Sequence, residues 1–166
     1  MEVNFMPTKE EDMARLLGMY RDSAYASMFR HFPEDCSEET LKAMFMAAGT
    51  LMRIEKDGSL VGFFYAVPSV KTKIADIAVV VLKEHQRQHI AETAIRKFVE
   101  LAFTEGKLSR VICHVTDPHL IQALKQGGFM EECRMYKNAF YNNKLWTESR
   151  MVLTREFYLK VIHKEH

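Results

Sequence analysis

The stretch from Ile74 to Phe103 constrains the fold most strongly, because it reads as a buried strand, a polar turn and an amphipathic helix. Residues from Ile74 to Leu82 are nearly all apolar and rich in Val and Ile, which predicts a central strand covered on both faces. The apolar pattern breaks at Lys83 and resumes at helical spacing, so we expect a helix to begin near Gln88. Its apolar positions are Ile90, Ala94, Ile95, Phe98, Leu101 and Ala102. A short turn that leads into a helix can bind an anion, because the first helical turn has free backbone amides and the positive end of the macrodipole.

Six further segments have the pattern of strands, and their connections predict a mixed sheet. They are residues 3–6, 51–55, 60–67, 110–115, 133–141 and 145–154. Asp57-Gly58 and Asn142-Asn143-Lys144 are turn sequences that predict two antiparallel hairpins, and Pro68 is expected to end a strand. The strand from Ile74 should pair antiparallel with the strand before it, and the helix after it should cross over to a parallel strand.

Three more helices are expected. Thr8 is the expected cap of the first, because acidic residues follow it, and Ser37 is the expected cap of the second. The third is expected over residues 119–126, after an Asp-Pro step at Asp117. Gly127-Gly128 should end it, and Phe129 should then return to the core.

Length and composition are those of an ordinary soluble protein, and residues 1–166 fit one domain. The formal net charge of +1 gives no general attraction to nucleic acid or to an anionic membrane, so neither is an expected partner. No apolar run approaches the roughly 20 residues of a membrane helix, and the sequence MEVNFMPTKEED has no apolar signal core. We therefore expect a cytoplasmic protein.

The three cysteines, Cys36, Cys113 and Cys133, include no close pair. This argues against a disulfide framework and against a zinc site, so no metal is expected. Cys113 lies within an apolar strand and is interpreted as a small core residue, because the sequence places no histidine to activate it as a nucleophile.

The turn before the helix reads Gln86-Arg87-Gln88-His89-Ile90-Ala91. Here the chain resembles the acetyl-CoA-binding core of the GNAT N-acyltransferase superfamily, whose loop pattern is Arg/Gln-x-x-Gly-x-Gly/Ala. His89 stands at the glycine of the pattern and Arg87 stands where a further glycine is often found. Glycine lets the backbone approach the pyrophosphate, so two alternatives follow. Arg87 and a protonated His89 contact the phosphates instead, or the loop has lost its ligand.

The resemblance extends over about residues 3–157. The segments ADIAVVV, AFTEGKLSRV and NAFYNNKLWTESRMVL are similar to the branch that acetylates protein N-termini, such as the ribosomal-protein alanine N-acetyltransferases. It implies an α/β fold with a mixed α+β sheet of six to seven strands, flanked by helices and splayed between its two central strands, with acyl-CoA in the split. The implied function is transfer of an acetyl group from acetyl-CoA to a primary amine, on a protein N-terminus or a small molecule, by direct attack. The alternatives are a catalytically inactive domain of the same fold that binds a partner protein or has a structural role, and a sensor that binds acyl-CoA without turnover.

The resemblance also implies candidate site residues. Those expected to bind the cofactor are Val79, Val80, Val81, Gln86, Arg87, Gln88, His89, Ile90, Ala91 and Asp117. Asp76 is the expected base, because a lone charge in an apolar strand is costly unless it is paired or at a pocket edge; the alternative is a solvated Asp at a strand end. His114 is the second candidate, with a core histidine as its alternative. Leu124 stands where many relatives have the tyrosine that protonates the thiolate, so Tyr136 or a water is expected to do so.

The connection between the first two helices contains four further candidates. Phe29, Arg30, His31 and Phe32 are expected to line the pocket for the acceptor, and the alternative is that they make core and rim contacts of a helical hairpin. The sequence does not identify the amine. A homodimer is compatible with aromatic residues such as Trp146 in the last hairpin.

Overall fold

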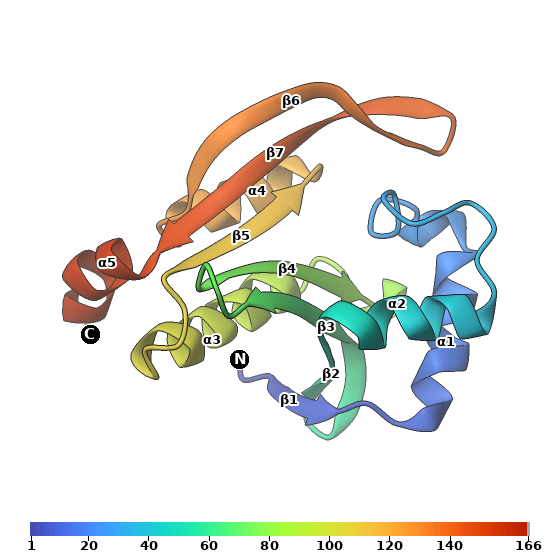
Figure 1. The fold of residues 1–166 in the computed structure, drawn as a ribbon, viewed down its shortest axis with the longest axis horizontal. Coiled ribbons are helices and arrows are strands. Elements are labelled where there is room, and N and C mark those ends of the chain that lie inside the picture. The colour runs from blue at the N-terminus through green and yellow to red at the C-terminus, as the bar shows by residue number, and fades with distance from the viewer. Residues whose placement is uncertain (166) are drawn as a thin grey trace.

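The computed structural model describes residues 1–165, apart from the side chains of residues 47, 48 and 165, and contains a seven-stranded mixed sheet with helices on both faces (Figure 1). The strands are β1 (Asn4–Pro7), β2 (Thr50–Lys56), β3 (Ser59–Ser69), β4 (Ile74–Val81), β5 (Arg110–Val115), β6 (Met130–Tyr141) and β7 (Lys144–Thr154). The helices are α1 (Glu10–Tyr20), α2 (Glu38–Ala48), α3 (Ile90–Thr104), α4 (Pro118–Gln126) and the short α5 (Arg155–Phe157). The strand order is β1-β2-β3-β4-β5-β7-β6, which confirms the expected fold class.

The sheet is splayed between its two parallel strands. β4 pairs antiparallel with β3 over its whole length, but it pairs with β5 only from Ile74 to Ile77. Beyond Ile77 and Cys113 the two strands diverge (Figure 1). Among the described residues, the stretch from Ala78 to Val81 therefore has no strand partner on the β5 side, which leaves backbone polar groups at this edge available for other partners.

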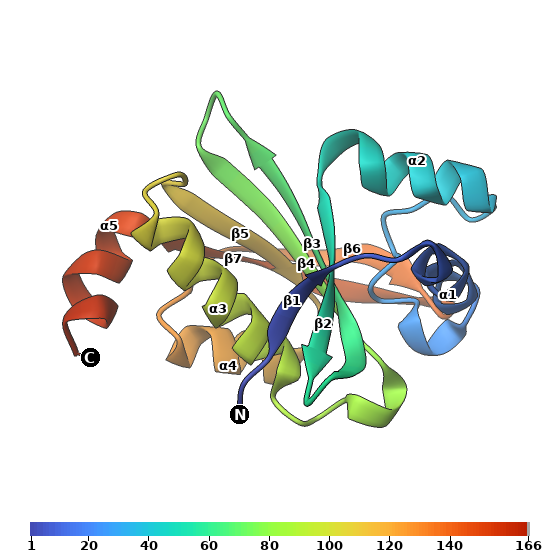
Figure 2. The same ribbon diagram turned by 90° about the horizontal axis from the view of Figure 1, so that it is seen from below.

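Apolar side chains form a core on each face of the sheet. α3 and α4 cover one face, while α1 and α2 lie on the other side (Figure 2). Ala75, Ile77 and Val81 of β4 are buried in the core beneath α3, but Asp76 and Ala78 are exposed on the other face. The prediction that β4 is covered on both faces is therefore wrong at these two positions, because α2 on that side packs against β2 and β3.

Several local predictions are confirmed. The Ser37 hydroxyl accepts the amide of Thr40 and caps α2. Asp57 and Gly58 both have positive φ, as a two-residue hairpin turn requires. Asn142 and Asn143 form the last turn in the same way, but Lys144 already belongs to β7, so the turn is one residue shorter than expected.

Other boundaries differ for identifiable reasons. Lys9 rather than Thr8 is the N-cap of α1, and its amide donates to the Asp12 carboxylate at 2.6 Å. α3 begins at Ile90 because His89, just before it, has a φ of 58°, which helical backbone does not adopt. β3 continues through Pro68, because β2 begins only at Thr50, opposite Ala66, and Pro68 therefore has no β2 partner whose ladder hydrogen bond could be lost.

The inward face of α3 is also shifted from the prediction. Val99 and Phe103 are buried with Ile90, Ala94 and Ile95, as the continuation of the helical stripe requires. Leu101, which was expected to face inward, is exposed. In the part of the chain that the structure describes, no helix has the length and apolar character needed to cross a membrane.

Candidate active site

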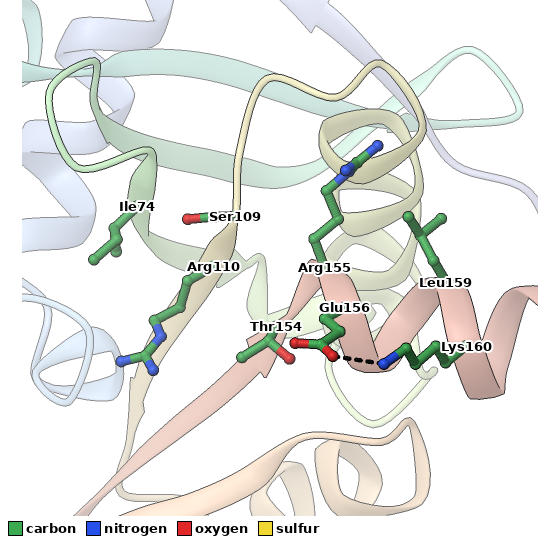
Figure 3. A pocket seen from close by; sticks show the side chains of 8 residues that line it. All are labelled: Ile74, Ser109, Arg110, Thr154, Arg155, Glu156, Leu159 and Lys160. Atoms are coloured by element: carbon green, nitrogen blue, oxygen red, sulfur yellow. Dashed lines mark hydrogen bonds and ion pairs between the residues drawn. The ribbon is translucent and has the colours of Figure 1, made fainter.

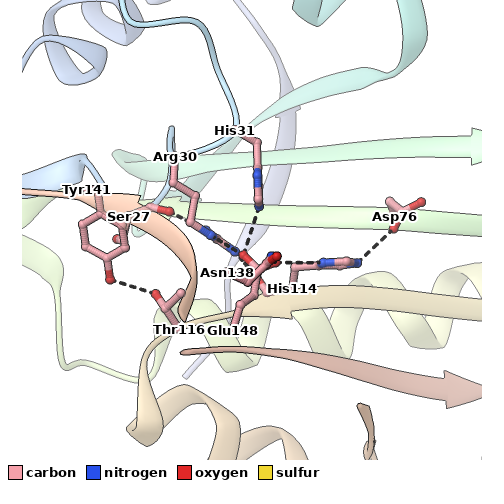
Figure 4. Close-up of polar contacts among 9 residues, drawn as sticks. All are labelled: Ser27, Arg30, His31, Asp76, His114, Thr116, Asn138, Tyr141 and Glu148. Atoms are coloured by element: carbon pink, nitrogen blue, oxygen red, sulfur yellow. Dashed lines mark hydrogen bonds and ion pairs between the residues drawn. The ribbon is translucent and has the colours of Figure 1, made fainter. Parts of the chain in front are cut away.

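A buried carboxylate lies at the centre of a polar cluster on the open face of the sheet. Glu148 of β7 is 1% exposed, and its Oε2 accepts from Arg30 Nε at 2.5 Å and lies 3.0 Å from His31 Nε2. Its Oε1 lies 3.4 Å from His114 Nδ1 and 3.4 Å from Asn138 Nδ2 (Figure 4). The carboxylate therefore connects β5, β6, β7 and the loop after α1.

Strand register explains why the cluster forms on one face. Asp76 lies beside Ile112 in the parallel β4–β5 pair, and His114 lies opposite Arg150 in the antiparallel β5–β7 pair. Because successive side chains of a strand point to opposite faces, Asp76, His114 and Glu148 share the face away from α3. Asp76 and His114 also lie next to Ile77 and Cys113, the last residues that pair before β4 and β5 diverge.

The charge of Glu148 is set by competing effects. Burial alone raises the pKa of this carboxyl, but the hydrogen bonds and positive charge of Arg30, followed by those of His31, outweigh burial and lower the pKa below its ordinary value. Arg30 also donates from a terminal guanidinium nitrogen to the His114 carbonyl at 3.0 Å, and from the other to the Ser27 carbonyl. The cluster thus contains a stable anion near neutral pH.

His114 lies between two carboxylates. Its Nδ1 faces Glu148, while its Nε2 lies 3.9 Å from Asp76 Oδ1. An acceptor at Nδ1 favours the neutral tautomer with its proton on Nδ1, which leaves the lone pair on Nε2. The His114 side chain is 35% exposed and that of Asp76 is 62% exposed, so a molecule from solvent can reach this nitrogen. His114 Nε2 can therefore accept a proton beside the Asp76 carboxylate.

The structure brings together Asp76, His114, Arg30 and His31, which were all predicted from the sequence. Tyr136 lies on β6 with 75% of its surface exposed, and it makes no contact with the polar cluster among the described hydrogen bonds.

Sequence reasoning missed Glu148 and Asn138. Glu148 is the only acid between Lys144 and Thr154, a weak signal, and its partner Arg30 is 118 residues away in the chain. No local spacing connects them.

A small apolar hollow lies in the core on the face of α1 and α2, between these helices, the loop after α1 and the sheet. Its volume is about 30 Å³. Six of the residues that line it are Phe29, Phe32, Phe45, Tyr65, Ala78 and Val80. Two of these, Phe29 and Phe32, were predicted to line the acceptor pocket, whereas Arg30 and His31 turn instead toward Glu148.

The loop before α3 retains a backbone suited to an anion despite its side chains. Arg87 and His89 have φ values of 61° and 58°, so both adopt the left-handed conformation that glycine normally provides. The His89 side chain is 76% exposed and its Nδ1 lies 3.2 Å from a carboxylate oxygen of Glu92. Because the backbone keeps the glycine-like conformation before the first amides of α3, these residues fit a phosphate-bearing ligand.

Of the remaining candidates for cofactor binding, three side chains hydrogen-bond the protein backbone and the others are apolar and buried or half-buried. The Gln86 amide donates to the Val81 carbonyl at 3.2 Å, and the Gln88 amide donates to the Glu84 carbonyl at 3.3 Å. Asp117 caps α4 by accepting the His119 amide at 2.9 Å. A structural role alone thus accounts for the side chains of Gln86, Gln88 and Asp117. Ile90 is buried and Ala91 half-buried at the start of α3, while Val79 and Val80 are half-buried along the free edge of β4.

A larger pocket of about 590 Å³ lies at the other end of the sheet (Figure 3). It is lined by Ile74 and Arg110, the first residues of β4 and β5, and by residues of the C-terminal segment. Lys160 pairs with Glu156 at 2.6 Å, and Arg155 donates to the Phe103 carbonyl at 2.8 Å. These two cations therefore already have partners. The splay lies at the opposite end of β4 and β5, so this pocket is separate from the polar cluster.

The splayed mixed sheet, with a histidine and two carboxylates near the point of divergence, defines the class of this protein as an α/β fold whose two central parallel strands separate. Residues 15–129 match the model of the acetyltransferase (GNAT) family. The chain therefore belongs to this family.

Individual relatives are polyamine acetyltransferases. The chain is 26% identical over 87 residues to spermidine N(1)-acetyltransferase of Vibrio cholerae serotype O1, a match that covers 51% of this chain and about half, 50%, of that relative. A structure of the Vibrio cholerae spermidine N-acetyltransferase in complex with CoA and spermine superposes with a TM-score of 0.81 at 19% identity, covering 95% of this chain and 98% of that one. A dodecameric structure of the same enzyme in an intermediate state gives a TM-score of 0.74 at 19% identity, covering 95% and 96%. These likenesses agree with the superfamily and not specifically with the ribosomal-protein alanine branch.

Proposed function

We propose that this protein is an acetyl-CoA-dependent N-acetyltransferase that acetylates a primary amine by direct attack on the thioester. The observation that carries the proposal is the orientation of His114 between Glu148 and Asp76. Buried Glu148 holds Nδ1, and Nε2 faces the exposed carboxylate of Asp76, two residues before the free edge of β4 begins.

In this proposal the cluster prepares the amine. A primary amine is protonated near neutral pH, so its ammonium group is attracted by Asp76, which is exposed and lies 3.9 Å from the imidazole. His114 Nε2 then accepts the proton, and the anionic Glu148 stabilises the imidazolium through Nδ1. Arg30 and His31 act as positioning residues, because they contact Glu148.

Acetyl-CoA would supply the acetyl group as a thioester. The free edge of β4 at Val79, Val80 and Val81 would hold the pantetheine arm, and the loop of residues 86–91 would hold the phosphates. Tyr136 is exposed outside the cluster, and the thiolate leaves without a dedicated acid near neutral pH. The acceptor is a protein N-terminus, as the resemblance to the alanine branch implies, or a small-molecule amine, as the names of the polyamine relatives indicate.

The test is release of the CoA thiol from acetyl-CoA with a panel of primary amines and peptide N-termini. His114→Gln retains a hydrogen-bonding side chain toward Glu148 but removes the base, so we expect kcat to fall about 100-fold or more. His163→Gln is the matched control, because His163 is exposed in the C-terminal segment, where it stacks on Tyr158. It should retain wild-type kcat.

Other outcomes distinguish the alternatives. Full activity of His114→Gln would exclude this histidine as the base. Binding of acetyl-CoA without thiol release would indicate a sensor. Absence of both would favour a catalytically inactive domain that binds a protein partner or serves a structural role.

A further inference from the structure

We infer that the acceptor is a primary amine that carries a short, uncharged apolar chain, and that the end of this chain occupies the hollow beside β4. The inference rests on the proposed function and specifies its substrate class. It differs from the polyamines that the relatives are named for, because the hollow offers no partner for a second charge.

Strand β4 leads from the polar cluster to the hollow. Asp76, Ala78 and Val80 alternate onto the same face of β4, and the last two line the hollow. Ala78 is two residues from Asp76, a separation of about 6.6 Å along a strand. If the amine nitrogen lies between Asp76 and His114, the end of a chain of about four carbons therefore reaches the hollow.

The walls of the hollow are aromatic and held in place. Phe29 and Phe32 contact each other at a ring-centroid distance of 5.6 Å, Phe32 and Phe45 at 5.4 Å, and Phe45 and Tyr65 at 5.0 Å. The Tyr65 hydroxyl donates to the Met44 carbonyl at 3.3 Å, so its hydrogen is engaged and only its oxygen can accept a further hydrogen bond. The walls consequently present apolar surface.

Charge in the hollow would be unfavourable. The residues that line it include no acid, so the second ammonium of a polyamine would lose water without gaining an ion pair there. A hydroxyl at the end of the chain would also lose its water, and among the lining side chains only the Tyr65 oxygen could accept from it. An alkyl end avoids both costs and gains burial of apolar surface.

The volume of the hollow limits the length of the chain. A cavity needs roughly 10–15 Å³ by this measure to hold one water, so the volume of about 30 Å³ accepts roughly two heavy atoms. The loop that forms one wall is also fixed by the site itself, because Arg30, next to Phe29, donates to Glu148. The loop that carries Phe29 is thereby tied to Glu148, whose Oε1 lies 3.4 Å from His114 Nδ1.

The experiment compares kcat/KM for butylamine, 3-amino-1-propanol and spermidine with acetyl-CoA. Butylamine and 3-amino-1-propanol have the same number of heavy atoms and differ only in a terminal methyl or hydroxyl group. We expect butylamine to exceed 3-amino-1-propanol by about tenfold or more, because the hydroxyl would move from water into a hollow whose walls are almost entirely apolar. Spermidine should fall below butylamine as well.

Two variants of the hollow give a second readout. Ala78→Leu fills it and should lower kcat/KM for butylamine about tenfold while leaving ethylamine, which is too short to reach it, nearly unchanged. Phe32→Ala enlarges it and should raise the ratio of hexylamine to butylamine. Phe157→Ala is the matched control, because Phe157 is partly exposed on α5, which contributes no residue to the hollow.

The inference is overturned if spermidine or 3-amino-1-propanol is used as well as butylamine, or if Ala78→Leu leaves the ratio of butylamine to ethylamine unchanged. Circular dichroism of each variant establishes that it is folded. Absence of thiol release with every amine would overturn the proposed function, and with it this inference. Turnover with the wrong order of amines would overturn the inference alone.

Discussion

At the scale of single residues, the environment of a side chain decides whether it is reactive or inert. Burial raises the pKa of the Cys113 thiol to about 12, an effect that outweighs the nearby Arg30. The interpretation of Cys113 as a core residue is confirmed by its burial in the core beneath α3. Cys36 is also buried, whereas Cys133 on β6 is exposed, and all three are free thiols.

We therefore expect a thiol-specific reagent at pH 8 to modify Cys133 alone in the native protein. Cys36 and Cys113 should react only after unfolding, because the reactive thiolate requires both access and ionisation. Mass spectrometry of the labelled peptides measures this. A Cys133→Ser variant should show no fast labelling, and rapid native labelling of Cys113 would contradict its burial.

At the scale of elements, the loop between β4 and α3 shows how a backbone conformation survives without its usual residue. Arg87 and His89 both have positive φ, a conformation that costs a non-glycine residue about 1 kcal/mol. Buried Ile90 and the packing of α3 against β4 keep the loop in this conformation. The loop that replaces glycine by histidine therefore stores a small amount of strain.

His89→Gly should relieve this strain, which stabilises the folded protein by about 1 kcal/mol. Glycine also has more freedom in the unfolded chain, which offsets part of this gain, so we expect the free energy of unfolding to rise by about 0.5 kcal/mol. Calorimetric titration should show that acetyl-CoA binds the wild type with a micromolar Kd, which corresponds to a binding free energy of about 8 kcal/mol. The variant should bind acetyl-CoA at least as tightly. Urea denaturation measures the stability.

Lys73→Gly provides the matched control, because Lys73 also has a positive φ, of 55°, and lies at the opposite end of β4. It should gain similar stability and bind acetyl-CoA as the wild type does. Binding by His89→Gly with none by the wild type would mean that the histidine closes the site.

At the scale of the whole molecule, Glu148 joins segments that are far apart in the chain. Its carboxylate contacts the loop after α1, β5 and β6 at once. Because removal of one partner from a buried ion pair leaves an uncompensated charge, the arrangement favours a single relative position of these segments. The hairpin tip adds a further tie, since Asn142 donates to the Ser23 carbonyl at 3.0 Å.

The lowered pKa of Glu148 predicts a pH dependence of stability. A carboxyl with a lowered pKa stabilises the fold above its ordinary value of 4.5, and this contribution is lost as the pH falls through the lowered value. Glu148→Gln should therefore be less stable than the wild type at pH 7, and its stability should decrease less steeply below pH 4.5. Urea denaturation from pH 7 to pH 3 measures both slopes.

Glu34→Gln is the control for this series, because Glu34 lies exposed in the loop before α2. Its stability should follow that of the wild type with pH. Equal slopes for Glu148→Gln and the wild type would contradict the ionised, paired state of Glu148.

The sequence by itself determined the elements and much of their pairing. Alternation, turn residues such as Asp57-Gly58 and caps such as Ser37 act over a few residues, so their pattern is readable along the chain. The resemblance to a known family supplied the splay between β4 and β5 and the candidate Asp76, while strand alternation supplied His114; the two side chains lie 3.9 Å apart. The roles of these residues, the location in the cytoplasm and any homodimer stay predictions.

Only the tertiary structure decided what surrounds the candidate base. The hollow lined by Phe29 and Ala78, and the position of Glu148 beneath His114, depend on register between strands and on a loop more than 100 residues away. Local periodicity carries no information about which distant side chains share a face. The cluster therefore became visible only when β5, β7 and the loop after α1 were placed side by side.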